Sequence, residues 1–440
     1  MSPATRCRWG GSGRWSTSAR PPGSDIPPGV RPDYEVVVAG AGPAGCGVAL
    51  RLAQIDPRLA ERTLVLDRAT FPRAKPCGGG LTGHAEDAMR ALDIPLEVDA
   101  WPAPGAVVRF GEFERRVVLA RPVRVVRREE FDHSLVRLAR RRGVDVVEGE
   151  GVVAFERVAD GVRVRTRRRT LTCRVLVGAD GAASVVRKTL HAGRRQRPHR
   201  LFKLELPAPP GRPPAADMVY DFTPMVHGLR GYLWVFPVPG NRLNVGLMHY
   251  PSRVNRGGGD LVSLLRDGLA EHGLALPDRG VRGWPAWGYH PRAPVSAPGV
   301  VTVGDAAGID ALTGEGIAVA LEHAIVAGDA IADALRTGDR SFADYRRRLR
   351  RAVVGRELAL DRWLAWLLYR GRGAWRRWLP LVLFDPEVIE LYAARVSGTA
   401  VLADHKLRLY RALARHVVKL PGRARALRAA APPAALLPAA

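Results

Sequence analysis

Short apolar runs and helical stretches alternate at the start of the chain. Residues 34–39 form an apolar run of the kind found in a strand buried within a parallel sheet. A helical stretch follows through Leu52, and a second apolar run, residues 63–66, ends at Asp67. Because strand, helix and strand follow in this order, the pattern predicts a βαβ unit and an α/β fold class.

The same pattern returns later in the chain. Residues 123–126 and 144–147 are strand-like, with a helical stretch between them. Apolar runs at 175–177 and 300–303 each lead into a glycine-containing turn, and a helix with small residues on one face follows Gly316. We expect one discontinuous Rossmann-like domain, made of residues 33–99, 123–194 and 297–338.

Two inserted segments have the character of antiparallel strands. In the longer one, residues 232–236 and 243–247 alternate and are separated by a Pro-Gly-Asn turn, which is typical of a β-hairpin. We expect both inserts to form an antiparallel-sheet domain that binds the substrate, which makes the chain α+β overall. The inserts cover residues 100–122 and 195–296.

The two ends of the chain differ from its middle. Residues 339–420 read as helical and contain many arginines and tryptophans, so we predict a C-terminal helical region there. Residues 1–32 and 421–440 are rich in small residues and proline, and we expect both to be disordered. No apolar run in the sequence approaches the roughly 18 residues that cross a bilayer.

Arginine dominates the charge of the chain. Its 440 residues include 68 Lys or Arg and 43 Asp or Glu, which gives a formal net charge of +25. The arginines are spread along the sequence without a nucleic-acid-binding motif, so we predict no nucleic-acid partner. Positive charge also attracts anionic lipid headgroups and phosphorylated substrates. We therefore expect a cytoplasmic protein with peripheral contact to the inner face of the membrane.

The spacing of cysteine and histidine argues against metal and disulfide sites. The 4 cysteines are scattered without a C-x-x-C pair, and the 11 histidines show no metal-ligand spacing. Such use of cysteine is typical of a reducing compartment. We predict a metal-free protein.

A glycine motif follows the first predicted strand at once. Gly40, Gly42 and Gly45 form G-x-G-x-x-G, and Asp67 lies 22 residues after Gly45. The first glycine permits a tight turn, the second lets the backbone approach a pyrophosphate, and the third allows close packing of helix on sheet. Asp67 can accept hydrogen bonds from ribose hydroxyls. Strand, glycines, helix, strand and acid together indicate a dinucleotide site.

A second glycine-rich stretch carries one thiol. Residues 75–81 read Lys-Pro-Cys-Gly-Gly-Gly-Leu. Glycines let a planar ligand or a lipid chain approach the main chain closely, because no Cβ stands in the way. A lone thiol in such a place indicates redox or proton-transfer chemistry. The alternative is a tight loop in which Cys77 is merely packed.

Taken together, these motifs resemble the geranylgeranyl reductase family of flavoproteins, within the larger group that shares the p-hydroxybenzoate hydroxylase fold. The resemblance spans residues 34–335 and implies FAD as the cofactor. The general flavin motifs are residues 40–45, 128–132, 178–181 and 304–305. The stretches that look similar to polyprenyl reductases in particular are 76–80, 232–237 with 244–246, and 312–317.

The resemblance implies roles for individual residues of these motifs. One group would hold the adenosine and pyrophosphate end, Asp305 the ribityl chain, and the Cys77 loop with Gly316 and Ile317 the flavin ring. The cofactor-binding residues that it implies are Gly40, Gly42, Ala44, Gly45, Asp67, Arg68, Cys77, Gly78, Gly80, Arg128, Val153, Asp180, Gly304, Asp305, Gly316 and Ile317.

Alternate aromatic residues mark one predicted strand, at Tyr232, Trp234 and Phe236. By pattern alone, such a stripe covers the core face of a sheet. In the context of the resemblance, the same face would wall a cavity above the flavin and bind the substrate. An apolar wall suits a polyprenyl chain, because a long hydrocarbon binds largely by burial of its area.

The reaction that the resemblance implies is reduction of isolated C=C bonds in a geranylgeranyl or other polyprenyl chain, carried as a prenyl lipid or a prenyl diphosphate. Reduced FAD would supply hydride, and a proton must reach the other alkene carbon. Cys77 is the only side chain of residues 76–80 able to give a proton, so it is our candidate catalytic residue. Packing against the flavin, or tuning its potential, is the alternative role for this thiol.

The electron source and the rival reactions stay open at this point. We predict no second, nicotinamide-binding domain, so NADPH would bind transiently or a ferredoxin-type carrier would reduce the flavin. The basic surface suits an acidic carrier of that kind. The first rival is an FAD-dependent monooxygenase or halogenase, although the Trp-x-Trp-x-Ile-Pro pattern associated with halogenases is absent, with Tyr232 and Phe236 in its place. The second rival is a membrane-associated flavoprotein that passes electrons to quinone.

Overall fold

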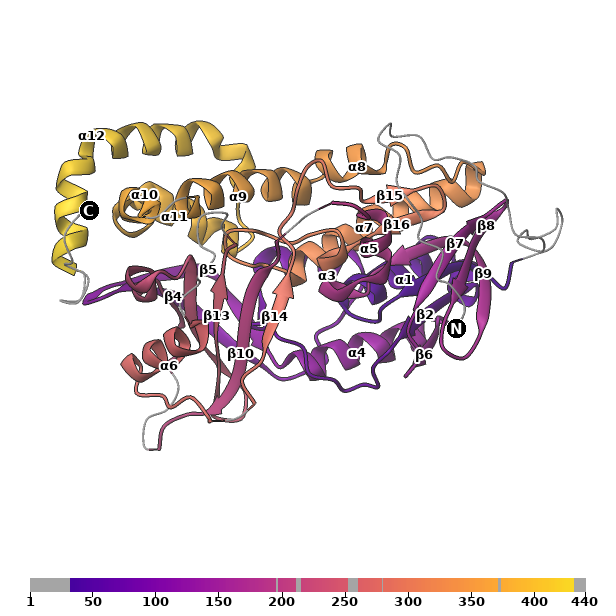
Figure 1. Ribbon diagram of the computed structural model, residues 1–440, viewed down its shortest axis with the longest axis horizontal. Helices are drawn as coiled ribbons and strands as arrows, with labels where there is room; N and C mark the ends of the chain where they lie inside the picture. Colours follow the sequence, from indigo (N-terminus) through magenta and orange to yellow (C-terminus); the bar gives the residue numbers. More distant parts are fainter. Residues whose placement is uncertain are drawn as a thin grey trace, which may run out of the picture.

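The computed structural model describes residues 32–194, 197–210, 215–251, 260–278, 280–370 and 373–430. Two β-sheets follow one another along the long axis of the molecule, and a group of C-terminal helices lies over the second sheet (Figure 1). Residues 1–31 and 431–440, which make up most of the segments predicted to be disordered, lie outside the described residues.

The first sheet is built from the short apolar runs. Its parallel strands run in the order β16-β9-β1-β2-β6, with antiparallel β15 at one edge and an antiparallel β7-β8 hairpin beside β9. The parallel core confirms the predicted Rossmann-like unit. The strands are β1 (Tyr34–Ala39), β2 (Thr63–Asp67), β6 (Asp145–Glu148), β7 (Ala154–Val158), β8 (Gly161–Arg165), β9 (Thr170–Gly178), β15 (Ser296–Ala297) and β16 (Val300–Thr302).

Both faces of this sheet are buried, which explains why its strands are continuously apolar. In β1, Val36 and Val38 pack with the helices, whereas Val37 packs on the side of β7 and β8. Helices α1 and α7 touch closely, since a Cβ on Gly47 would lie 2.8 Å from the Cβ of Ala324. The helices of this part are α1 (Pro43–Ile55), α2 (Pro57–Glu61), α3 (Gly83–Ala91), α4 (Arg128–Arg141), α5 (Val185–Leu190) and α7 (Ile317–Thr337).

The second sheet consists of the predicted inserts and is antiparallel except for one parallel pair, β11 with β4. Its order is β14-β10-β13-β12-β11-β4-β5-β3. The strands are β3 (Gly80–Leu81), β4 (Ala100–Phe110), β5 (Phe113–Val126), β10 (His199–Pro207), β11 (Met218–Asp221), β12 (Gly231–Val238), β13 (Arg242–His249) and β14 (Gly283–Ala286).

One predicted boundary between the two sheets was wrong. Residues 123–126 were expected in the cofactor domain, but they are the end of β5, where Val123 and Val125 pair with β4 of the second sheet. Gly80 pairs with Val125 as well, so the end of the Cys77 loop also joins this sheet. An apolar run of four residues cannot by itself reveal which sheet it pairs with.

The two faces of β12 have different partners. Tyr232, Trp234 and Phe236 share a buried cluster with Met218 of β11 and Val123 of β5. On the opposite face, Leu233 and Val235 pack with residues of α6 (Leu261–Glu271). Because both faces of β12 are covered, Tyr232, Trp234 and Phe236 are shielded from bulk solvent. The side chains between them, Leu233 and Val235, belong to the hydrophobic core on the opposite face.

The C-terminal helices cover the aromatic side of the second sheet, and α11 packs against β5 (Figure 1). The last helix extends to Ala430, past the predicted end of the helical region at residue 420. No helix within the described ranges is long and apolar enough to cross a membrane. The helices are α8 (Tyr345–Arg351), α9 (Val353–Tyr369), α10 (Ala374–Phe384), α11 (Pro386–Val396) and α12 (Lys406–Ala430), and the 3-10 turns are η1 (Gly181–Ala183), η2 (Thr223–His227), η3 (Gly304–Ala306) and η4 (Leu402–His405).

Candidate functional site

A single large cavity of about 1230 Å³ extends between the two sheets. Loops at the carboxyl ends of the first sheet line one end of it, the aromatic face of β12 lines the middle, and α9, α10 and α11 close the other end. Ligands of open α/β sheets bind at the carboxyl ends of the strands, so the first end is the expected cofactor end. Three parts of the chain that are distant in sequence therefore line one cavity.

The glycine turn lies at the cofactor end. Gly40 has a φ of +108°, and a Cβ there would lie 2.3 Å from the carbonyl oxygen of Ala179. Gly45 does not line the cavity. Its Cα packs against the backbone of the turn, where a Cβ would lie 1.8 Å from the carbonyl oxygen of Gly40. Gly42 and Ala44 line the cavity at the start of α1, whose N-terminus has no side-chain cap among the described residues. Such a helix end attracts an anionic group.

Asp67 lies beside this turn and is almost fully buried. Its carboxylate accepts hydrogen bonds from the backbone N–H groups of Ala41 and Ala69, each 2.9 Å long. Each carboxylate oxygen has a further lone pair for a ligand hydroxyl. Arg68 and Val153 line the cavity at the same end, as expected. Asp67 thus holds the glycine turn as well as bordering the cavity.

Arg128 is buried at the start of α4 and forms two hydrogen bonds to Asp132, of 2.8 and 3.0 Å. Burial opposes its charge, yet the attraction of Asp132 holds the pKa of Arg128 above its ordinary value. The guanidinium also interacts with the side chain of Cys77. Arg73, which the sequence did not single out, lines the same region and lies 3.3 Å from Asp132.

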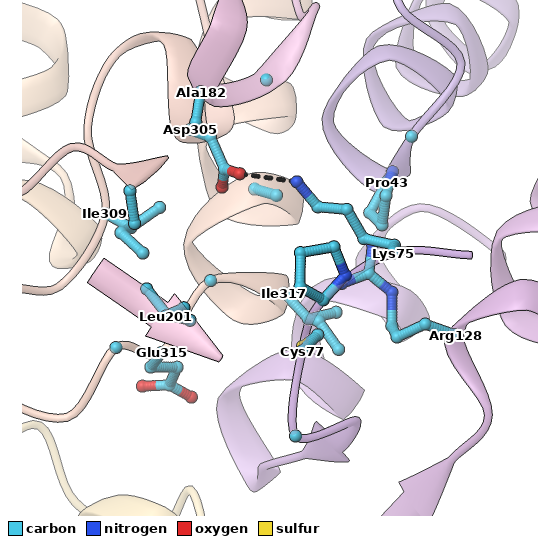
Figure 2. A pocket seen from close by; sticks show the side chains of 18 of the residues that line it. Pro43, Lys75, Cys77, Arg128, Ala182, Leu201, Asp305, Ile309, Glu315 and Ile317 are labelled. Atoms are coloured by element: carbon cyan, nitrogen blue, oxygen red, sulfur yellow. Dashed lines mark hydrogen bonds and ion pairs between the residues drawn. The ribbon is translucent and has the colours of Figure 1, made fainter. Parts of the chain in front are cut away.

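An ion pair crosses the cavity wall between Lys75 and Asp305, with 2.9 Å between Nζ and Oδ2 (Figure 2). Burial would raise the pKa of Asp305, but Lys75, Arg128 and Arg73 together hold it below its ordinary value. Asp305 is therefore an anion that can accept hydrogen bonds from a polar ligand. The sequence motif assigned no role to Lys75, yet its amine contributes most among the positive charges that lower the pKa of Asp305.

The Cys77 loop is fixed from below by Asn244. The Asn244 side-chain amide donates to the carbonyl oxygen of Cys77 at 2.7 Å, and its oxygen accepts from the Trp234 indole N–H at 3.0 Å. The N–H of Gly79 points at the Cys77 sulfur at 3.4 Å. Gly78 lies against Phe236, where a Cβ would come within 2.8 Å of the ring. The loop and the aromatic stripe are thus one unit, and Gly80 completes the lining.

The aromatic stripe forms an apolar wall of the cavity. Tyr232, Trp234 and Phe236 all line it, and the Tyr220 ring lies 5.4 Å from the Tyr232 ring and 5.1 Å from the Phe236 ring. The Tyr232 hydroxyl donates to the carbonyl oxygen of Thr313 in the loop before α7. Aromatic side chains this close to one another exclude water from the space above the Cys77 loop.

Four further expected residues differ in their placement. Gly316 and Ile317 line the cavity at the start of α7. Gly304 does not line it and instead allows close packing, because a Cβ would lie 2.8 Å from the Cβ of Ala44. Asp180 lines the cavity and accepts a 2.6 Å hydrogen bond from Val185 N–H, whereas its Oδ1 has no partner within the described part of the chain.

These observations fit a bound FAD. An uncapped helix N-terminus, a glycine opening and a buried carboxylate with an orphaned oxygen line the same end of the cavity. Cys77, Gly78 and Gly80 line the same cavity, and Gly78 lets the loop lie directly against the Phe236 ring, which fills the place of a Cβ. The described residues contain no group of three or more side chains that could hold a metal ion.

The cavity also contains polar residues that the sequence did not identify as functional. Glu315 lines it from the loop before α7, and Tyr392 and Arg395 line it from α11. Glu315 lies within the stretch 312–317 that had been recognised for its resemblance, so a signal for it existed. No motif marks Tyr392 or Arg395, because only the packing of the C-terminal helices brings them to the cavity.

Comparison with known proteins likewise indicates an FAD-binding chain. The chain matches the FAD binding domain family over residues 33–359. It is 28% identical over 345 residues to digeranylgeranylglycerophospholipid reductase 2 of Methanothermobacter thermautotrophicus, covering 73% of this chain and 84% of that protein. It is 29% identical over 248 residues to the menaquinone reductase of Mycobacterium tuberculosis strain H37Rv, covering 48% of this chain and 54% of that one.

Solved structures share the fold. A geranylgeranyl bacteriochlorophyll reductase-like protein from Thermoplasma acidophilum superposes with a TM-score of 0.63 at 20% identity, covering 90% of this chain and 99% of that one. The halogenase PltM superposes with a TM-score of 0.62 at 16% identity, covering 91% and 88%. At such identities the likeness establishes the fold, and the two chemistries have to be separated by the site itself.

Proposed function

Because the chain belongs to the FAD binding domain family, and within it to the flavoproteins of the geranylgeranyl reductase type, we propose that it reduces C=C double bonds of a polyprenyl chain. The substrate is a prenyl lipid or a prenyl diphosphate. The name of the digeranylgeranylglycerophospholipid reductase relative supports a lipid of this class. FAD is the cofactor of the reaction.

The observation that carries this proposal is the continuity of one cavity. It begins at the glycine turn, passes the Cys77 loop and ends in an apolar chamber between β12 and the C-terminal helices. Side chains such as Val382, Val388 and Val396 line that chamber. A long hydrocarbon can therefore lie with one part beside the flavin position and the rest among apolar side chains. Burial of the apolar surface of the hydrocarbon then stabilises the complex.

The residues of the site have separable tasks. When bound, reduced FAD supplies a hydride to the alkene. The start of α1 and Asp67 would hold the pyrophosphate and the ribose of FAD, and Asp305 would accept hydrogen bonds from its ribityl hydroxyls. Asn244 fixes the Cys77 loop against the aromatic wall, because it hydrogen-bonds both the Cys77 carbonyl oxygen and the Trp234 indole N–H. The apolar wall excludes water, so protons must reach the alkene from side chains.

Cys77 is our candidate proton donor or positioning residue. Its sulfur lies against the Gly79 N–H and the Arg128 guanidinium, so it is held in one place. We expect Cys77→Ser to lower the rate of alkene-dependent flavin reoxidation while FAD stays bound. Unchanged turnover in that variant contradicts a proton-donor role and leaves Cys77 a packing role.

The electron donor is NADPH, bound transiently, or a ferredoxin-type carrier. The formal charge of +25 suits an acidic carrier protein. The two sources differ in salt dependence, because protein–protein steering by charge weakens as ionic strength rises. Stopped-flow reduction of the flavin by each donor, at low and high salt, distinguishes them.

We also propose that the protein contacts the inner face of the membrane through α12. This helix exposes Leu407, Tyr410, Val417 and Val418 to solvent, with Lys406, Arg411 and Lys419 on the same helix. Apolar side chains mixed with basic ones are typical of helices that lie in a lipid interface. Peripheral contact would bring a lipid substrate to the C-terminal helices that close the cavity.

The first experiment is anaerobic. The holoenzyme is reduced with dithionite and mixed with geranylgeranyl diphosphate, and the flavin absorbance and the product mass are followed together. Reoxidation with a gain of two hydrogens per double bond supports the proposal. Reoxidation only after air is admitted, with an oxygenated product, supports the rival monooxygenase instead.

A further inference from the structure

We propose that Glu315 delivers the proton that alkene reduction consumes, and that Glu322 on α7 renews this proton from the surface between α3 and α7. The inference rests on the proposed function; it assigns the donor role to Glu315 and leaves Cys77 the positioning role. The proposed reaction requires a proton at one alkene carbon. Each turnover consumes one proton, and the apolar side chains around the cavity exclude the bulk water that could supply it.

Glu315 is the carboxyl group of the loop before α7 that lines this cavity. The Thr82 hydroxyl donates a hydrogen bond to Oε1 of Glu315. The other oxygen, Oε2, lies 3.7 Å from the Arg395 guanidinium, which is beyond hydrogen-bond distance. Figure 2 shows Glu315 at the cavity wall, apart from the Lys75–Asp305 ion pair. Oε2 is therefore the oxygen that can carry a transferable proton.

Arg395 does not neutralise Glu315, because its charge is already shared. It forms two hydrogen bonds to Asp361, of 2.8 and 2.7 Å, and its Nε lies 2.8 Å from Glu357. The carboxyl groups of Glu315, Glu357 and Asp361 thus lie within 4.0 Å of one buried guanidinium, and Glu322 lies on the helix that follows Glu315. So many carboxyl groups with one cation cannot all be ionised, and protons must remain among them.

Glu322 on α7 is the group behind Glu315. Its Oε1 lies 3.8 Å from Nδ1 of His84 on α3, and the Nε2 of His84 has no hydrogen-bond partner among the described residues. Burial raises the pKa of Glu322 to about 8, and the charges of Glu315, Glu357 and Asp87 add to this while that of Arg395 opposes it. Glu322 therefore holds a proton at neutral pH, and a negative charge on Glu315 strengthens that hold.

The proton balance of one turnover follows from this arrangement. One alkene carbon accepts the hydride, and the other forms a C–H bond with the proton of Glu315 as its O–H bond breaks. The carboxylate left on Glu315 regains a proton from Glu322. Glu322, whose side chain is 20% exposed, regains its proton from solvent, with His84 on α3 3.8 Å away. No further oxidant or reductant is needed beyond the hydride of the reduced flavin.

The test uses the reduced holoenzyme without oxygen and geranylgeranyl diphosphate in single turnover. We expect Glu315→Gln to slow flavin reoxidation by about 10²-fold or more, the range of a general acid. Glu315→Asp should restore part of the rate, and FAD should stay bound in both variants. The control is Glu390→Gln on α11, whose side chain is exposed, and it should react like the wild type. A Glu315→Gln variant that reacts at the wild-type rate overturns the inference.

A second measurement does not depend on the substrate. Glu322 has a folded pKa of about 8, above its ordinary value of 4.5, so protonation favours the folded state. Its contribution to stability is complete at acidic pH and is lost as pH rises toward 8. Glu322→Gln should therefore gain stability relative to the wild type over this window, measured by denaturant unfolding. Parallel pH curves for the two proteins contradict the proton store.

The two proposals can fail separately. If the wild-type flavin is not reoxidised by geranylgeranyl diphosphate, the proposed alkene reduction is wrong, and the delivery role of Glu315 falls with it. If the wild type reacts and Glu315→Gln reacts equally fast, alkene reduction stands and only the delivery role is overturned. A reaction slowed by Cys77→Ser but not by Glu315→Gln would return the donor role to Cys77 and overturn the inference.

Discussion

Gly42 and Gly45 belong to one motif, yet they have different surroundings. A Cβ on Gly42 would have only the Arg73 Nη2 atom nearby, at 3.4 Å, and the backbone φ of −76° suits alanine. A Cβ on Gly45 would lie 1.8 Å from the Gly40 oxygen. Gly42 therefore leaves space for a ligand, whereas Gly45 permits the close backbone packing of the glycine turn.

We expect Gly42→Ala to leave the stability of the apoprotein nearly unchanged and to weaken FAD binding by about tenfold or more, a loss near 1.4 kcal/mol. The added methyl group would stand where a pyrophosphate has to approach. Gly45→Ala should instead destabilise the fold by about 1–3 kcal/mol through overpacking. Thermal unfolding without FAD and a flavin titration measure the two effects. Equal behaviour of the two variants would contradict this division.

Asn244 is a positioning residue for the Cys77 loop. Asn244→Ala leaves a buried Trp234 N–H and the Cys77 carbonyl without their partner, which we expect to cost about 1–3 kcal/mol of unfolding free energy. Asn244→Asp is the matched control, because its carboxylate still accepts from the indole but cannot donate to Cys77. Because that carboxylate is buried beside the Cys77 carbonyl oxygen without a cation partner among the described residues, Asn244→Asp should be at least as unstable as Asn244→Ala in a denaturant titration. Wild-type stability of both variants would show that the contacts are not required.

At the scale of elements, α11 decides the shape of the substrate end. It packs against β5 and places Tyr392, Ala393, Arg395 and Val396 in the cavity lining. Ala394, on the same helix, is not part of that lining. Neighbouring alanines on one helix therefore provide a test of which face meets the substrate.

Ala393→Phe should shorten the chamber. We expect the kcat/KM for geranylgeranyl diphosphate to fall by about tenfold or more, because a pocket discriminates by about 1–3 kcal/mol for each methylene that it excludes. Geranyl diphosphate, which is shorter, should lose less. Ala394→Phe is the matched control and should preserve the preference for the longer chain. A uniform loss on both substrates would indicate general damage to the helix.

At the scale of the whole molecule, the question is how a protein of net charge +25 uses its basic surface. The exposed Val417 and Val418 of α12 lie near Lys419, where apolar and cationic contacts with a membrane would coincide. Attraction to anionic lipids weakens with salt, whereas burial of apolar side chains does not. Vesicle binding can therefore separate the two contributions.

We expect the protein to sediment with phosphatidylglycerol vesicles more than with phosphatidylcholine vesicles, and less so at high salt. Val417→Asp combined with Val418→Asp should weaken binding by roughly tenfold per residue, the worth of burying one valine. Ile55→Asp, an exposed apolar residue of α1, is the control and should bind like the wild type. Equal binding of all variants would remove α12 from the contact.

The local pattern of the chain determined the elements that carry the cofactor end. Apolar runs gave β1 and β2, and the glycines between them required a tight turn at a helix start. These features depend on neighbours in sequence, so period and residue type suffice to predict them. The same holds for the hairpin of β12 and β13, whose turn contains Gly240 and Asn241 at positive φ.

Only the tertiary structure decided which sheet each strand joined and which side chains met in the cavity. Residues 123–126 belong to β5 because their partners lie in β4, and a short apolar run contains no information about a distant partner. Lys75 and Asp305 are far apart in sequence, and so are Glu315 and Arg395, yet each pair meets through chain folding. The sequence by itself determined the cofactor motif, whereas packing of the C-terminal helices determined the chamber, since contact between distant segments depends on the whole fold.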